Sequence, residues 1–107
     1  MAFFDQKQHT SLTHVYNTAK HDTVKIWTLY KIAYEYGNTT PDTAIIISQK
    51  ALLKSEKIAF EKGKGWAWKG IGHAYLIKGQ NDKAIFYFEK TIPVFQKAKE
   101  LRGLAAA

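Results

Sequence analysis

The sequence predicts an all-α domain built from antiparallel helix pairs. Between its polar or glycine-rich breaks, apolar residues recur at intervals of three and four, which is the spacing of one helix face. The apolar pattern of residues 29–36 also returns at residues 68–75, so the helices belong to an internal repeat. The one strand-like run, residues 45–47, is short and isolated between helical patterns. We therefore expect about five helices and no sheet.

The first helix is expected over residues 8–20. Leu12, Val15, Tyr16 and Ala19 supply its apolar positions at helical spacing. This pattern is weaker than those that follow, because few apolar residues support it.

The second helix is expected over residues 24–36. Ile26, Leu29, Ala33 and Tyr36 recur at three and four and define one buried stripe.

The third helix begins at the polar break that ends in Thr40, Pro41 and Asp42. These provide a capping hydroxyl, a proline suited to the first turn and an acid at the positive end of the helix. We expect this helix to continue to about Ala59.

The fourth helix is expected over residues 65–77, after a glycine-rich break at residues 62–65. Its predicted inward positions are Trp68, Ile71, Gly72 and Tyr75.

The fifth helix is expected from Asp82 to about Leu101, with a kink near residues 88–92 because Pro93 removes one backbone hydrogen bond. Its predicted inward positions are Ala84, Ile85, Phe88 and Ile92.

The chain of 107 residues suffices for one hydrophobic core, so we expect a single domain over residues 1–107. After the helix at 8–20, the two repeat units are expected at residues 22–60 and 64–101. Residues 102–107 are similar to the beginning of the second unit, which predicts the start of a truncated third repeat.

The second repeat unit resembles the tetratricopeptide repeat (TPR) family. The matching residues are Trp68, Ile71, Gly72, Tyr75, Ala84 and Phe88, together with the turn at Gly79. The first unit is degenerate, with Leu29, Ala33 and Ser48 at three of these positions, and in the second unit Thr91 and Pro93 depart from the family pattern. The resemblance implies a TPR-like α-solenoid. A generic helical bundle with the same apolar stripes is the alternative.

Two phrases, at residues 18–25 and 41–44, are similar to the amino-terminal TPR arrays that precede sensor kinases and DNA-binding regulators in Bacteroidetes. This resemblance implies a fragment or truncated relative of such a signalling protein, and a non-catalytic scaffold that binds other proteins.

The residue types and their spacing give little support for a catalytic, metal-binding or phosphate-binding site. There is no Cys, and the four histidines have no metal-ligand spacing. The glycines at residues 63–72 lack the Lys-Ser or Lys-Thr of a phosphate-binding loop. We expect no enzyme activity, no metal and no cofactor. The sequence shows neither a signal peptide nor a membrane-spanning run, which favours the cytoplasm for this fragment and excludes a membrane partner.

The TPR resemblance implies that the first helix of each unit lines a concave, peptide-binding face. Mapped onto this sequence, that face carries Trp27, Tyr30, Tyr34, Trp66, Lys69 and His73. The first three residues and the last three each share one helix stripe. We predict an aromatic and basic groove for an acidic or carboxylate-ended peptide. The alternative is that Trp27, Tyr30 and Trp66 are core residues packed on the helix at 8–20.

Two further classes of partner stay open. The net charge of +7 is compatible with nucleic acid, but the lysines are scattered and a solvated helix face explains them. Solenoid units bury their cores by stacking. The last helix, with Ile92, Phe95 and Leu101, is therefore also predicted to be covered by a second copy or by a following repeat.

Overall fold

The structure is a computed structural model that describes the backbone of residues 12–106 and the side chains of residues 12–99. This part of the chain forms five helical segments and no strand, which confirms the predicted all-α fold. A short helix at residues 12–18 precedes α2 (Asp22–Gly37), α3 (Pro41–Lys57), α4 (Glu61–Ile77) and α5 (Asn81–Ala106). Residues 8–11 of the predicted first helix lie outside the described residues.

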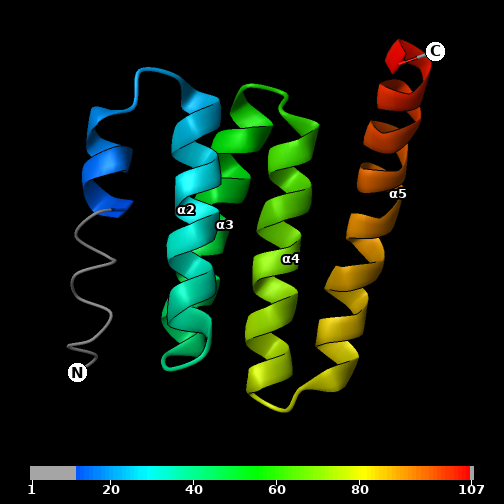
Figure 1. The fold of residues 1–107 in the computed structure, drawn as a ribbon. Coiled ribbons are helices and arrows are strands. Elements are labelled where there is room, and N and C mark those ends of the chain that lie inside the picture. Colours follow the sequence, from blue (N-terminus) through cyan, green and yellow to red (C-terminus); the bar gives the residue numbers. More distant parts are fainter. Residues whose placement is uncertain (1–11, 107) are drawn as a thin grey trace.

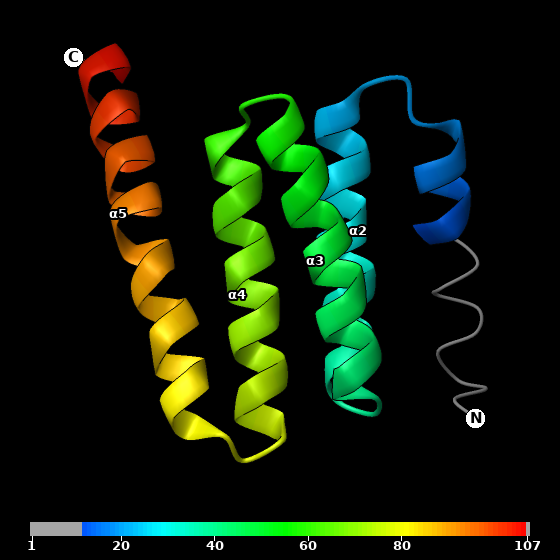
Figure 2. The same ribbon diagram turned by 180° about the vertical axis from the view of Figure 1, so that it is seen from behind.

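Successive helices run up and down in antiparallel order (Figure 1). Among the four labelled helices, each contacts its neighbour in sequence, and α2 also contacts α4. The view from behind shows α3 on the opposite side of the α2–α4 pair, with α5 at one end (Figure 2). This arrangement is compatible with a solenoid, because the α2–α3 pair packs on α4 while α5 contacts neither α2 nor α3.

The core consists of small and branched side chains between α2, α3 and α4. The predicted inward residues Ile26, Leu29 and Ala33 are all buried. Alanines face them from the neighbouring helices, so the helix axes can approach closely. The two buried clusters are Ile26, Leu29, Ala51 and Ala67, and Ala33, Ala44, Ile45 and Ala74.

The contact between α4 and α5 depends on Gly72. A Cβ atom at this position would lie 2.9 Å from the ring of Phe88 and 3.3 Å from the carbonyl oxygen of Ala84. Such contacts are too short for a methyl group, so any larger residue would push the helices apart. Gly72, predicted to point inward, is buried at this contact.

The α4 helix begins at Glu61, four residues before the predicted start. Gly63 and Gly65, predicted to form a break, lie inside its first turns. Their lack of a side chain serves packing, since a Cβ at Gly63 would contact Ser55 and one at Gly65 would contact Phe95. Glycine in a helix costs about 1 kcal/mol relative to alanine, which these close contacts offset.

The turn before α4 lies instead at residues 58–60. Ala59 there has a positive φ of 54°, and the N–H of Phe60 donates to the carbonyl of Ser55 at 2.8 Å. Gly79 closes α4 in the same way, with a φ of 81°. Both ends are left-handed C-terminal caps, one on alanine and one on glycine.

The last helix differs from the prediction in two respects. It passes through Pro93 and continues to Ala106, so residues 102–106 extend α5 and no turn separates them from it. Ile85 and Ile92, predicted to point inward, are each 53% exposed. Among the four labelled helices α5 packs on α4 alone, so neither α2 nor α3 covers the side of α5 that carries these two residues.

Candidate functional site

Four of the six predicted groove residues come together where α2 lies beside α4. The ring of Tyr30 stacks on Trp66, with centroids 6.3 Å apart and planes 19° apart. Tyr34 stacks on His73, with centroids 4.3 Å apart and planes 7° apart. An edge-to-face contact of 5.9 Å joins Tyr30 to Tyr34. The two helix stripes predicted from sequence therefore form one aromatic face, which we name the α2–α4 face.

Trp27 belongs to the same face but does not stack on the other rings. It lines a hollow of about 390 Å³ together with Trp66 and Phe60. Thr23, Val24 and Lys62 complete the wall. The Nζ atom of Lys31 lies 5.8 Å from the centre of the Trp27 ring. This hollow has aromatic walls and a cation at its rim, which suits an apolar side chain flanked by acids.

Phe60 completes the aromatic cluster from the turn between α3 and α4. Its ring meets Trp66 edge to face, with centroids 5.6 Å apart. Thr23 and Lys62 were not predicted for the site, although each lies four residues before a predicted tryptophan and continues its helix stripe by one turn, because the two helices were expected to begin at residues 24 and 65. Phe60 and Val24 lie outside the two stripes. An aromatic residue one position before a helix and six before Trp66 was the available signal for Phe60.

The face is partly buried and partly open. Trp27 and Tyr34 are 41% and 37% exposed, while Tyr30, Trp66 and His73 are half-buried. Within the described part of the chain, the rings that contact Tyr30 and Trp66 come from α2, α4 and Phe60. Trp66 and Phe60 also pack on the core cluster around Ile26, as does Tyr16 of the helix at 12–18. The face therefore contributes to helix packing and still presents aromatic surface.

The imidazole ring of His73 packs in a narrow space beside Gly37. Its Nε2 atom is buried and has no hydrogen-bond partner in the described part of the chain. A Cβ on Gly37 would lie 2.8 Å from the ring, so only glycine leaves room for it there. Burial, followed by the positive charge of Lys69, lowers the pKa of His73 below its ordinary value of 6.5. His73 is consequently neutral at pH 7.

The charge of the face comes from lysines. Lys69 is exposed and lies close enough to His73 to affect its titration. Lys31 and Lys62 lie beside Trp27, at the ring and at the hollow. Burial, followed by the electrostatic influence of Tyr34, raises the pKa of Tyr30, so the Tyr30 phenol is protonated at neutral pH. The face is therefore aromatic, neutral at its centre and positive at its edges.

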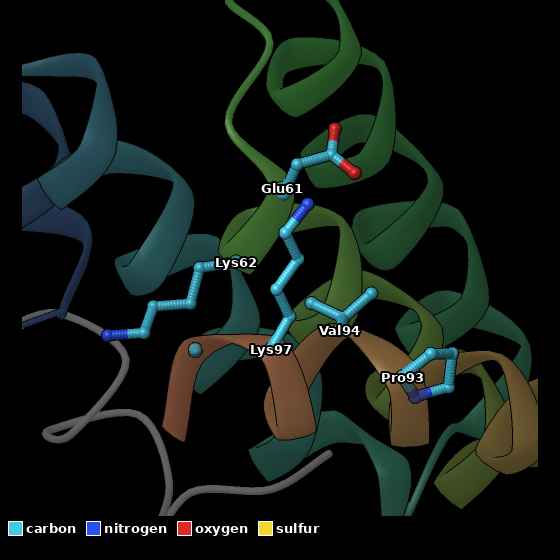
Figure 3. A pocket seen from close by; sticks show the side chains of 6 residues that line it. Glu61, Lys62, Pro93, Val94 and Lys97 are labelled. Atoms are coloured by element: carbon cyan, nitrogen blue, oxygen red, sulfur yellow. The ribbon is translucent and has the colours of Figure 1, made fainter. Parts of the chain in front are cut away.

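A second hollow, of about 420 Å³, lies between the start of α4 and the second half of α5 (Figure 3). Pro93, Val94 and Ala98 form its apolar wall. Figure 3 shows Lys97 extending toward Glu61, while Lys62 extends away from both. Lys62 borders both hollows, but no predicted groove residue reaches this second one.

The described residues contain no group of three or more His, Cys, Asp or Glu that could hold a metal ion. In the same part of the chain, no helix is long and apolar enough to cross a membrane. No family model, curated protein or solved structure matches this chain.

Proposed function

We propose that this chain is a non-catalytic protein-interaction module, a TPR-like scaffold that binds an acidic peptide or partner segment on the α2–α4 face. The observation that supports this most is the joining of Tyr30, Trp66, Tyr34 and His73 into one partly exposed aromatic face beside the hollow at Trp27. Such modules also occur as the sensory or scaffold part of signalling proteins, and that role is part of the proposal.

The rings favour binding of an extended or helical peptide. Aromatic side chains provide large contact areas at small entropic cost, and they are frequent among residues that dominate binding energy. Here the stacking across α2 and α4 holds Tyr30 and Tyr34 in place before any ligand arrives. A rigid face loses little conformational entropy when it binds.

The charges favour an acidic ligand. Lys31, Lys62 and Lys69 surround the rings, while the neutral His73 contributes no charge at its centre. A peptide with an apolar anchor for the hollow and carboxylates on each side would complement this pattern. Exposed lysines contribute modestly to affinity but strongly to selectivity and association rate.

The test is a binding titration with a pool of fluorescently labelled acidic peptides that contain aromatic or aliphatic anchors. We expect saturable binding that persists at physiological salt, and a loss of roughly tenfold in affinity for the Lys69→Glu variant. Lys57→Glu is the matched control, since it reverses the same charge on the exposed surface of α3.

Equal weakening by both charge reversals would show only a general attraction of anions, and would contradict a site on this face. The same titration with a single-stranded oligonucleotide separates the classes of partner. Binding of the oligonucleotide alone, and only at low salt, would contradict peptide recognition.

A further inference from the structure

A row of lysines runs along one side of α5. Lys83, Lys90 and Lys97 follow one another at seven-residue intervals, so they share one side of the helix over a length of about 21 Å. None of the three forms an ion pair with another described side chain. The exposed acids Asp82 and Glu89 directly precede two of these lysines in sequence, and adjacent residues of a helix do not face each other. This side of α5 is therefore positive along its length.

Aromatic rings lie beside this row, where α5 packs on α4. The Nζ atom of Lys90 lies 4.9 Å from the centre of the Trp68 ring and 5.1 Å from that of Phe86. Nearer the start of α5, the Nζ atom of Lys83 lies 5.2 Å from the centre of the Tyr75 ring. Phe86 is 56% exposed, while the other two rings are half-buried. We name the surface formed by these rings and the three lysines the α4–α5 seam.

A second lysine approaches each of the two rings on α4. The Nζ atom of Lys64 lies 5.6 Å from the centre of the Trp68 ring, and that of Lys78 lies 6.0 Å from the centre of the Tyr75 ring. Lys64 and Lys78 each pair with an acid at the start of a helix, whereas the lysines from α5 stay uncompensated in the described structure. The fold thus collects lysines that are scattered in the sequence, and leaves a free cation beside each ring.

The combination of rings and cations distinguishes between classes of anion. An acidic peptide would use the lysines alone. Single-stranded nucleic acid carries both a chain of phosphates and planar bases that stack on aromatic side chains. The exposed ring of Phe86 beside Lys90 provides for both groups at once. A duplex keeps its bases stacked inside, so it would gain nothing from the ring.

We propose that the α4–α5 seam binds single-stranded nucleic acid, with phosphates along the three lysines and a base stacked on Phe86. This surface is separate from the α2–α4 face. Trp68 and Tyr75 each follow a residue of that face by two positions, which turns them to the opposite side of α4. Peptide and nucleic acid therefore occupy different sites, and each proposal can fail without the other.

Fluorescence anisotropy of a labelled single strand of about eight nucleotides, measured at several salt concentrations, tests the charge of the seam. We expect the Lys90→Gln variant to bind more weakly and to reduce the slope of log K against log salt by about 0.7, the share of one phosphate contact. Lys20→Gln is the matched control, since Lys20 is exposed in the turn before α2, at the other end of the molecule from α5 (Figure 1). Circular dichroism verifies that both variants fold.

The Phe86→Ala variant tests the stacking. We expect a loss of roughly tenfold in affinity for the single strand, and weaker binding of a duplex of the same sequence that this variant does not change. Leu53→Ala is the control, because Leu53 is 67% exposed on α3.

Four results would overturn the proposal. The first is a single strand that does not bind at low salt, and the second is a duplex that binds as tightly as the single strand. The third is wild-type affinity in Phe86→Ala or equal weakening by Lys20→Gln and Lys90→Gln. The fourth is displacement of the strand by polyglutamate as effectively as by unlabelled strand, which would show that the seam attracts any acidic chain.

Discussion

The imidazole of His73 on α4 lies parallel to the phenol ring of Tyr34 on α2, with centroids 4.3 Å apart and planes only 7° apart. Beneath it, Gly37 leaves room for the ring at the end of α2. The pair thus connects two helices that are not neighbours in sequence, and it is held by packing, since the Nε2 atom has no partner in the described structure.

Stability should decrease on mild acidification because of His73. Burial and then Lys69 lower its pKa in the folded chain below the ordinary 6.5, so the unfolded chain binds more protons in this range. The stability that neutral His73 contributes is fully present above the unfolded-state pKa of 6.5. It is lost as the pH falls from there through the lower pKa of the folded chain. Thermal unfolding of the wild type and of His73→Phe should therefore diverge with pH in this window. Parallel curves would contradict the account.

Gly37→Ala should destabilise the fold by about 1–3 kcal/mol, because the added methyl would overlap the ring of His73. Urea unfolding followed by tryptophan fluorescence measures the change. The double variant Gly37→Ala/His73→Ala should recover part of the loss, since the second change removes the obstructed ring. Additive losses would show that the two positions are independent.

The C-terminal ends of α3 and α4 allow opposite alanine–glycine substitutions to be compared. Ala59 and Gly79 both have left-handed backbones, with φ of 54° and 81°. Ala59→Gly should stabilise the fold by about 1 kcal/mol, and Gly79→Ala should destabilise it by a similar amount. Nothing lies within 4 Å of a Cβ at Gly79, so backbone strain alone is measured there. In chemical denaturation, we expect the free energy of unfolding to increase for Ala59→Gly and to decrease for Gly79→Ala.

Two buried serines should respond differently to alanine. The Oγ of Ser48 has no hydrogen-bond partner in the described structure, whereas the Oγ of Ser55 donates to the carbonyl of Ala51 at 2.8 Å. Ser48→Ala removes an unpaired polar group and should be neutral or stabilising by about 1 kcal/mol. Ser55→Ala removes a satisfied one and should not stabilise. A larger gain in denaturant midpoint for Ser55→Ala would contradict this assignment.

The periodicity of apolar residues was sufficient to predict the helices and many of the buried residues. Ile26 and Ile71 are buried as expected, because their spacing determines which side of a helix they share. The glycines were harder to interpret. The glycine-rich segment around Gly63 and Gly65 is typical of a turn, yet both residues lie inside α4. They are glycines there because side chains of neighbouring segments fill the space that a Cβ atom would occupy.

The exposed isoleucines show a different limit. Ile85 has the same spacing and residue type as the buried Ile45, and only the position of the other helices distinguishes them. For the site, helix spacing predicted which rings share a stripe. It could not pair Tyr30 with Trp66 or bring Phe60 beside them, since those contacts depend on how α2, α4 and the turn before α4 pack together.

Ligand binding at the α2–α4 face can be measured with the chain's own tryptophans. Trp27 and Trp66 line the hollow there, while Trp68 lies on another side of α4, with its ring under Lys64 and Lys90. The Trp68→Phe variant keeps both reporters, and Trp27→Phe/Trp66→Phe keeps only Trp68. Titration of both with an acidic, aromatic-containing peptide should give a saturable fluorescence change in the first variant alone. A change that persists with Trp68 alone, or none in either variant, would contradict binding at this face.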